Sequence, residues 1–292
     1  MKKTYTLSIG ILVFFSLLTV FFSSGTYITL ASKTVYVGGN GPGNYTLIQD
    51  ALDNSTTGET VFVFPGTYHE HIVITTPVTL MGEEKTSTII DGSNEEYVVA
   101  IEAGNSTLSG FTITHSGTAF PLAGVYVKSN QNTVSGNILT DNFYGMRLLD
   151  GTGYNTIQGN EITHNMRCGV YFSRSSNNIL IGNIVSNHPF NGFGLYEFSN
   201  NNTLLDNVLS HNNFSGINIR DSFNTHVVDN RFLENQVGLH VPPPEYSTVM
   251  QGNVFSGNTM DLQEEQESLP IIGIVFGCLV VIVFFILKKW KT

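Results

Sequence analysis

Hydrophobic and polar residues along the middle of the chain follow a pattern that returns every 23 or 24 residues. Within each repeat, apolar residues alternate with polar ones in short runs that end at glycine or asparagine. A fixed period of this size is typical of a solenoid, and alternation with a period of two predicts two or three short strands joined by tight turns. The repeat is marked by two positions five residues apart: Asn137–Asn142, Asn160–Asn165, Asn183–His188, Asn207–Asn212, Asn230–Asn235 and Asn253–Asn258.

Stacked repeats of this kind form parallel sheets in which each coil rises about 4.8 Å above the last. The sequence therefore predicts an all-β, parallel β-helix of about nine coils, roughly 43 Å long. The asparagines are expected at the bends, bonded to their own turn and to the next coil. Two apolar columns are expected in the core: Val134, Ile157, Leu180, Leu204, Val227 and Met250 in one, and Leu139, Ile162, Val185, Leu209, Phe232 and Phe255 in the other.

Residues 35–92 are expected to form the entry to the solenoid. Thr46–Gln49 fits a capping box, and Ile48, Ala51 and Leu52 give one apolar helix face, so a short helix is expected to cover the first coil. Without that cover, the free strand edges would invite strand addition. Strands are expected at 61–64, 72–75, 78–81 and 88–90, with a turn at Pro65-Gly66.

At the other end of the solenoid, Pro242, Pro243 and Pro244 are expected to blunt the last edge, because proline has no ladder donor. A recognition site for a proline-binding partner is the alternative.

Both ends of the chain carry membrane signals. Two lysines and an apolar stretch with small residues after it predict a signal peptide over 1–32, the alternative being an uncleaved anchor. An uncharged run over 269–287 is long enough to span a bilayer, and the lysines of 288–292 place the tail in the cytoplasm. A buried globular helix is the alternative for that run. The β-helix ectodomain is thus expected over 33–260, with an acidic linker over 261–268.

The composition limits the classes of partner that are expected for the protein. The net charge of −10 argues against nucleic acid. The two cysteines, Cys168 and Cys278, fall in the solenoid and in the apolar terminal run, so no disulfide is expected.

Several segments resemble a known family. Residues 45–52 and 58–68 resemble the entry motif of the pectin-lyase-like right-handed parallel β-helices. Leu80-Met81-Gly82, Thr88-Ile89-Ile90-Asp91-Gly92 and the repeats are similar to secreted or membrane-anchored archaeal β-helix proteins of the NosD type. The resemblance covers roughly 34–258 and implies a right-handed coil. It implies carbohydrate as a ligand class but no particular reaction, since the superfamily includes lyases, hydrolases, surface-layer proteins and binding modules.

One outward strand face is a candidate binding strip. Side chains between the inward residues of successive coils are expected about 4.8 Å apart, where aromatic faces stack on sugars and arginine or asparagine bonds to hydroxyls or carboxylates. An aromatic ladder that merely stabilises the sheet is the alternative. The strip comprises Tyr126, Arg147, Tyr171, Tyr196, Asn218 and His240.

Catalysis and metal binding have weaker support. Asp206 and Asp229 occupy equivalent positions in adjacent coils and could hold Ca²⁺, but glycine fills that position in other coils, which favours a left-handed turn. The repeats vary little in length, apart from an insertion around 118–123, so no deep cleft is expected and an enzyme is the less favoured reading. If the chain is an enzyme, a polysaccharide lyase or glycoside hydrolase is expected.

No cofactor is expected, and copper is the alternative that the NosD resemblance implies. His164 and His211 share an outward column but lie two coils apart, with His188 one position over, so solvated or ladder histidines are favoured. His69 and His71 alternate on one strand face and are too few to define a site.

Two further surface features are predicted. Ile181, Leu205 and Val228 are expected to project outward as an apolar patch, either an oligomer or partner surface or one that a loop covers. Glycosylation sequons occur at Asn44, Asn54, Asn105, Asn201 and Asn213, and Asn105 is expected to be the least accessible because it aligns with inward asparagines. Together these features predict a membrane-anchored extracytoplasmic module that binds glycans or envelope proteins or has a structural role. A carbohydrate-active enzyme and a NosD-like copper accessory protein are the alternatives.

Overall fold

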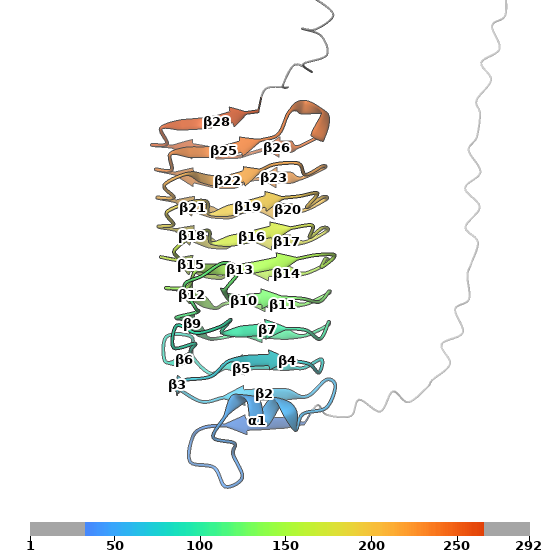
Figure 1. Ribbon diagram of the computed structural model, residues 1–292, viewed down its shortest axis with the longest axis vertical. Coiled ribbons are helices and arrows are strands. Elements are labelled where there is room, and N and C mark those ends of the chain that lie inside the picture. The colour runs from blue at the N-terminus through green and yellow to red at the C-terminus, as the bar shows by residue number, and fades with distance from the viewer. Residues whose placement is uncertain (1–32, 266–292) are drawn as a thin grey trace, which may run out of the picture. The chain divides into compact units, whose positions relative to one another are not determined.

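The computed structural model describes residues 33–265. The predicted signal peptide, membrane span and cytoplasmic tail lie outside these residues. Within 33–265, no helix has the length and apolar character needed to cross a bilayer. The described chain is a parallel β-solenoid of about ten turns, closed at its N-terminal end by one helix (Figure 1).

Three parallel sheets make up the solenoid, and most coils contribute one strand to each. The first sheet comprises β1 (Thr34–Val37), β2 (Thr60–Val63), β5 (Thr79–Gly82), β8 (Thr107–Ser109), β11 (Thr133–Ser135), β14 (Thr156–Gln158), β17 (Ile179–Ile181), β20 (Thr203–Leu205), β23 (His226–Val228) and β26 (Val249–Gln251). The second comprises β3 (Gly66–Tyr68), β6 (Thr88–Asp91), β9 (Thr112–Thr114), β12 (Ile138–Thr140), β15 (Glu161–Thr163), β18 (Ile184–Ser186), β21 (Val208–Ser210), β24 (Arg231–Leu233) and β27 (Val254–Ser256). The third comprises β4 (Ile72–Ile74), β7 (Val99–Ile101), β10 (Ala123–Val127), β13 (Tyr144–Leu149), β16 (Val170–Ser173), β19 (Phe193–Tyr196), β22 (Ser215–Ile219), β25 (Val237–Val241) and β28 (Met260–Glu264).

The two predicted apolar columns are confirmed by the strand register. Val134 pairs with Ile157 in the first sheet, and Leu139 pairs with Ile162 in the second, and the same partnership continues coil by coil to the C-terminal end. These side chains are almost fully buried until the last coil, where Met250 is 42% exposed.

The asparagines form inward ladders, as predicted. In the first ladder, the Nδ2 of Asn137 donates to Oδ1 of Asn160 at 3.1 Å, and the backbone N–H of Asn137 donates to the same oxygen at 3.0 Å. Asn160 bonds to Asn183 in the same way, so each amide side chain satisfies two donors of the preceding coil. Because buried backbone groups without partners are costly, these ladders fix where each coil must bend. The two repeat positions five residues apart each form one ladder. A third ladder lies at another bend and comprises Asn132, Asn155, Asn178 and Asn202.

The N-terminal cover is helix α1 (Ile48–Asp53), which buries Ile48, Ala51 and Leu52 as expected. The predicted capping box is wrong, because Leu47 is the N-cap residue and makes no side-chain cap bond. The cap comes instead from Glu70, whose two carboxylate oxygens accept the N–H groups of Ile48 and Gln49 at 2.8 and 2.9 Å. A local motif search could not find it, since the capping carboxylate belongs to the following coil.

Other strand predictions need small corrections. Strands were expected within one or two residues of β2, β4, β5 and β6, but β3, which begins at the predicted turn residue Gly66, was missed. Pro244 begins a short 3-10 helix, η1 (Pro244–Tyr246), beside the last coils. Strand β28 continues to Glu264, so residues 261–264, which were assigned to the linker, belong to the last coil.

His188 is the one histidine in an asparagine ladder, and it is buried. Its Nδ1 accepts the backbone N–H of Asn165 at 3.2 Å, and its Nε2 lies 3.1 Å from the carbonyl oxygen of Ile162. A neutral ring with the proton on Nε2 satisfies both contacts. Burial lowers the pKa of His188 to about 4.

The buried His188 predicts an acid-sensitive step in stability. Below a pH of about 6.5 the unfolded chain binds a proton at this ring and the folded chain does not, so stability falls as the pH drops from about 6.5 towards 4, by roughly 2–3 kcal/mol. We expect His188→Asn, which restores the asparagine ladder, to remove this loss. Urea unfolding at neutral pH and near pH 4.5 measures it, with the exposed His211→Asn as the control. Equal pH dependence in wild type and His188→Asn would contradict the assignment.

Candidate functional site

The outward face of the third sheet holds the predicted strip, with one change. The register aligns Tyr126 with Arg147, Arg147 with Tyr171, and Asn218 with His240. The residue between Tyr171 and Asn218 is Gly194, whereas Tyr196 was expected there. Tyr196 lies two positions further along and pairs with Ser173.

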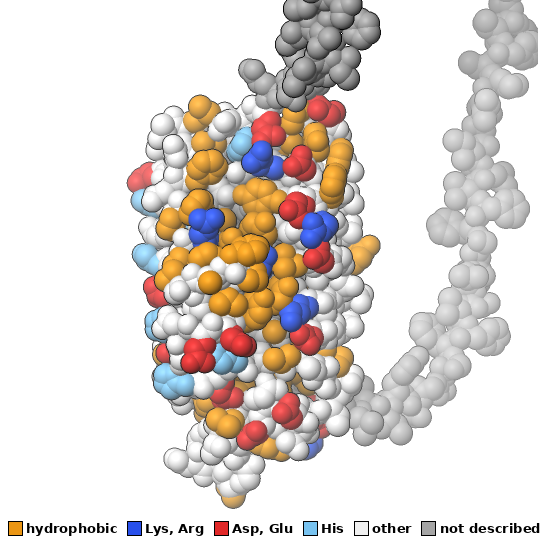
Figure 2. Space-filling view, viewed as in Figure 1, with side chains coloured by type: hydrophobic (Ala, Val, Ile, Leu, Met, Phe, Trp, Pro, Cys, Tyr) orange, Lys and Arg blue, Asp and Glu red, His pale blue; other side chains and the backbone are white. Residues whose placement is uncertain are grey.

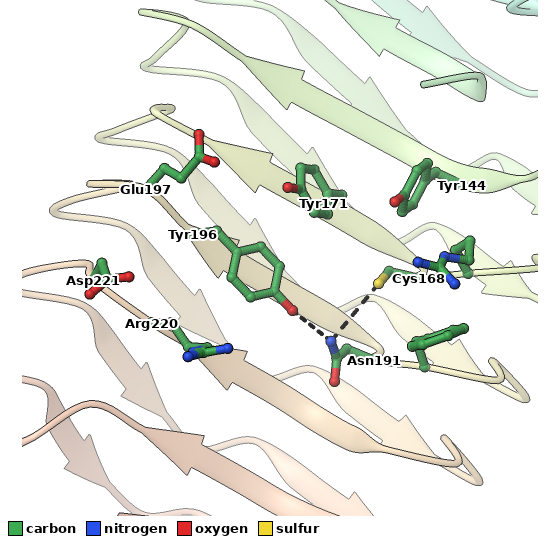
Figure 3. Close-up of a pocket in the computed structure, with 10 residues that line it drawn as sticks. Tyr144, Cys168, Tyr171, Asn191, Tyr196, Glu197, Arg220 and Asp221 are labelled. Atoms are coloured by element: carbon green, nitrogen blue, oxygen red, sulfur yellow. Dashed lines mark hydrogen bonds between the residues drawn. The ribbon is translucent and has the colours of Figure 1, made fainter. Parts of the chain in front are cut away.

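Tyr196 nevertheless occupies the space of the strip, because its ring folds back over Gly194. A β-carbon at Gly194 would lie 2.5 Å from the ring of Tyr196, so glycine is required beneath it. The amide Nδ2 of Asn191 donates to the Tyr196 hydroxyl at 2.7 Å and holds the ring in place (Figure 3).

Tyr144, which the sequence analysis missed, extends the aromatic row by one coil. The ring centroids of Tyr144 and Tyr171 are 5.2 Å apart, and those of Tyr171 and Tyr196 are also 5.2 Å apart. Tyr144 packs with buried Ala123 and Cys168 in an apolar cluster outside the solenoid core. We call Tyr144, Tyr171 and Tyr196 the tyrosine row.

A hollow of about 360 Å³ lies against the tyrosine row. Figure 3 shows Tyr171 between Tyr144 and Tyr196, with Cys168 and Asn191 nearby and Glu197, Arg220 and Asp221 on the side of Tyr196. Hydrophobic side chains gather across the middle coils on the face that Figure 2 shows, with acidic and basic side chains among them. The remaining lining residues are Arg167 and Phe190, whose guanidinium and ring lie 3.9 Å apart.

A sequence signal for these missed residues exists. Tyr144, Arg167 and Phe190 each follow the second ladder position of their repeat by two residues. Large side chains at this offset can close one margin of the sheet face, but a single strand's alternation does not reveal it.

The hydroxyls and the thiol of the hollow are neutral at ordinary pH. Burial raises the pKa of all three tyrosines in the row, most strongly at Tyr196. Burial also raises the pKa of the Cys168 thiol to about 11, which removes it as a nucleophile near neutrality. The hollow therefore offers aromatic faces and neutral hydrogen-bonding groups.

The charged groups at the margin are partly committed to one another. Glu197 accepts bonds from Arg174 and from the hydroxyl of Ser173. The Nε of Arg220 lies 3.0 Å from Glu265. These ion pairs orient the Glu197 and Arg220 side chains at the margin of the hollow. Arg167 adds a cation stacked on Phe190.

Three predicted strip residues are buried. Arg147, Asn218 and His240 are 3%, 4% and 8% exposed, so the expectation that all six lie open to a ligand is wrong. Arg147 lies beneath the inserted loop and donates from Nη1 to the carbonyl of Pro121 at 2.6 Å. Desolvation by burial lowers the pKa of His240, whose Nε2 is 3.7 Å from Glu265.

Asp206 and Asp229 sit in left-handed turns, with φ of 54° and 53°. The equivalent glycines Gly136, Gly159 and Gly182 have φ between 59° and 64°. Asparagine and aspartate tolerate this conformation, so the turn explains both residues. Neither belongs to a group of three or more metal-ligating side chains, and the described residues contain no such group.

The histidines considered for copper are dispersed. His164 and His211 are exposed in left-handed turns, and Nε2 of His211 lies 2.9 Å from Glu234. His188 belongs to the ladder described above. Nδ1 of His69 lies 3.7 Å from Asp91, while Nδ1 of His71 is 2.8 Å from the carbonyl of Tyr97.

The predicted surface features have mixed outcomes. Ile181, Leu205 and Val228 are aligned in adjacent coils and half-buried, and their role in an oligomer stays a prediction. Asn105 is exposed, which corrects the expectation that it is the least accessible sequon. The inward position belongs to Ser106, whose N–H donates to Oδ1 of Asn132 at 3.0 Å. The sequons Asn54, Asn201 and Asn213 are exposed, and Asn44 is half-buried.

The turn assignment of Asp206 and Asp229 makes a prediction. The double variant Asp206→Gly, Asp229→Gly keeps the backbone conformation, so we expect stability to change by no more than about 1 kcal/mol. Added calcium should leave the melting temperature of wild type and variant alike unchanged, because no ion is held. Thermal unfolding with and without calcium measures both. A calcium-dependent rise in wild type that the variant loses would reinstate the metal site.

Comparison with solved structures identifies the same fold. The catalytic domain of Agl-KA superposes with a TM-score of 0.57 at 17% identity, over 74% of this chain and 43% of that one. Pectate lyase Pel9A gives 0.55 at 13% identity, over 82% of this chain and 78% of that one. The pectin methylesterase from Yersinia enterocolitica gives 0.51 at 12% identity, over 78% and 98%. At these identities the likeness is one of fold.

No curated protein matches the sequence. The family model described as periplasmic copper-binding protein (NosD) matches residues 52–271, which is most of the chain. The match spans the solenoid repeats, the ladders and the coils that present the tyrosine row. The chain belongs to the NosD family of β-helix proteins.

Proposed function

We propose that this NosD-family chain is an extracytoplasmic binding module that holds glycans in the hollow beside the tyrosine row. The observation that carries the proposal is the row itself: Tyr144, Tyr171 and Tyr196 follow one another at ring separations of 5.2 Å along one margin of the hollow. Sugar rings have apolar faces and hydroxyl edges, so they suit aromatic surfaces flanked by amide, guanidinium and carboxylate groups. The volume falls within the range of roughly 300–1,000 Å³ common for small-ligand sites.

The charged and polar rim supports sugar over a purely apolar ligand. Asn191 is buried, and its Oδ1 has no partner among the described residues. A ligand hydroxyl donating to that oxygen would satisfy it. Arg167 and Arg220 supply donors, and Asp221 supplies an acceptor, around the aromatic surface.

Binding without cleavage is favoured over hydrolysis. A glycosidase needs one free carboxylate and one carboxylic acid on opposite sides of the scissile bond. Glu197 is already bonded to Arg174 and Ser173, and this leaves the hollow without a prepared pair. The carbohydrate-active enzymes that share the fold support carbohydrate as a ligand class and support no reaction here.

Copper chemistry does not fit the described residues. Copper sites use several histidine, methionine or cysteine ligands that converge on one ion. His164 and His211 are separated by an intervening coil, and His188 is committed to its ladder. We therefore derive no step through copper for this part of the chain.

The location of the module rests on residues outside the described range. We propose that 1–32 directs export and that 269–287 anchors the solenoid in the membrane, with 288–292 in the cytoplasm. The family description as periplasmic agrees with an extracytoplasmic solenoid.

The tyrosine row predicts the effect of single substitutions on binding. We expect Tyr171→Ala to lower the affinity for bound glycans by about tenfold or more, since a stacked ring of about 1.4 kcal/mol corresponds to that factor. Tyr196→Phe keeps the ring over Gly194 and should retain most of the affinity. Binding of the full-length protein in detergent to a glycan array measures it, with mass spectrometry of every bound glycan for products.

A matched control and two contrary outcomes complete this test. Tyr154 is 66% exposed and lies outside the hollow, so Tyr154→Ala should bind as wild type does. Equal losses for Tyr154→Ala and Tyr171→Ala would argue against the hollow as the site. Detection of cleavage products would identify the protein as an enzyme.

A further inference from the structure

The inserted loop covers a buried arginine beside the hollow. Nine positions separate Ser116 from Val125, against four between the equivalent residues Asn142 and Met146 of the next coil. The five extra residues lie within a loop over 117–122, which we call the cover loop. Its Phe120 ring lies 4.9 Å from the Arg147 guanidinium.

Arg147 is a cation that forms no ion pair with the residues of 33–265. Its only hydrogen bond among the described residues is the one to the Pro121 carbonyl, and its buried Nε has no partner there. Asp150 lies near enough for the charge of Arg147 to affect its pKa. The pKa of Asp150 is lowered mainly by a hydrogen bond from Arg174, and further by the charges of Arg174 and Arg147. That carboxylate is bonded to Arg174, so Arg147 retains an unpartnered Nε donor on its planar guanidinium.

Aromatic rings hold the guanidinium on the other sides. Its carbon lies 5.4 Å from the ring of Tyr144, 5.3 Å from that of Tyr171 and 5.9 Å from that of Tyr126. Cation–π contacts offset part of the cost of removing the charge from water, but they leave the Nε–H group unsatisfied. An arginine held this way is already positioned for an incoming oxyanion.

The middle of the cover loop is exposed. Thr118, Ala119 and Phe120 are exposed, with Phe120 at 67%. The loop hydrogen bonds to the solenoid through the Gly117 N–H at its start, through the Pro121 carbonyl at Arg147, and through the Leu122 carbonyl at its end, which accepts the Tyr144 N–H at 3.3 Å. The Leu122 N–H bonds back to Ala119 within the loop. Loop segments with few contacts to the body open at low free-energy cost.

The hollow leads to this position. Tyr144 and Tyr171 line the hollow and also contact the guanidinium, so a group on a ligand that stacks there approaches Arg147 once the loop moves. We propose that Arg147 is an oxyanion subsite, closed by the cover loop, that receives a carboxylate, sulfate or phosphate group of a ligand bound in the hollow. The role of the subsite in ligand binding rests on the proposed glycan function. The affinity of Arg147 for an oxyanion does not depend on that function.

The first arm of the test compares matched oligosaccharides. Full-length protein is titrated with an oligomer of glucuronic acid, the oligomer of glucose of equal length, and a sulfated glucose oligomer. We expect wild type to prefer an acidic oligomer by about tenfold. Arg147→Gln should lose that preference, and Arg147→Lys should keep a part of it. The preferred oligomer identifies whether the anion is a carboxylate or a sulfate.

The second arm needs no sugar. A variant lacking residues 118–121, which brings the turn close to the length of the next coil, exposes Arg147 permanently. Its melting temperature should rise in sodium sulfate relative to sodium chloride at equal ionic strength. The same deletion combined with Arg147→Gln should show a smaller rise, equal to the general stabilisation by sulfate as an excluded salt.

The two arms separate the two proposals. If no oligosaccharide binds but sulfate stabilises the loop-deleted protein through Arg147, the glycan function fails and the oxyanion subsite stands. If glycans bind and Arg147→Gln keeps the acidic preference, the subsite is overturned. Circular dichroism confirms that each variant is folded, and an unfolded Arg147→Gln transfers the decision to Arg147→Lys. For that variant, an acidic preference equal to that of wild type, together with a rise in sulfate for the loop-deleted protein no larger than that of the wild type, overturns the subsite.

Discussion

The surface of the middle and C-terminal coils, where the tyrosine row lies, depends on the asparagine ladders. Each ladder amide must meet the amide and the backbone N–H of the coil before it, as Asn160 meets Asn137 at 3.1 and 3.0 Å. That requirement fixes the position of each bend and therefore the number of residues between bends. Side chains on the outward faces then align in rows that repeat at the coil spacing. The tyrosine row is assembled from successive coils held in this way, although its rings come from different register positions, since Tyr171 pairs with Gly194 and Tyr196 pairs with Ser173.

The sequence specified the repeated parts of the structure and misplaced those that depart from the repeat. Periodicity alone located the apolar columns and the ladders, because each of those residues makes the same contacts in every coil. The prediction of the strip failed at Gly194. A glycine has no side chain, so the sequence does not indicate which face of the sheet its position belongs to. Tyr196 fills that space from two residues away by folding its ring back, and alternation along a strand cannot describe such a contact.

Burial on the outward face could not be read from alternation either. Alternation separates inward from outward positions, but it does not say what covers an outward side chain. Arg147 points away from the core and is buried all the same, because residues 117–122 fold over it. In the same way, Glu70 reaches back from the next coil to cap α1, and the local motif at Thr46 is unused. Both contacts join residues more than twenty positions apart in the sequence. Residues about one coil apart in a solenoid lie next to each other in space.

A solenoid of near-constant coil length has little freedom to create a concave site, and this constrains function. The hollow here arises from long side chains at the margin of one sheet and from the glycine beneath Tyr196, with no long loop enclosing it. Such a surface excludes water poorly, and the strong electrostatic effects that catalysis needs require a water-excluded site. Stacking on aromatic rings tolerates water at its edges, because its contribution comes from contact area. The architecture therefore supports the proposed recognition of an extended polymer across several coils.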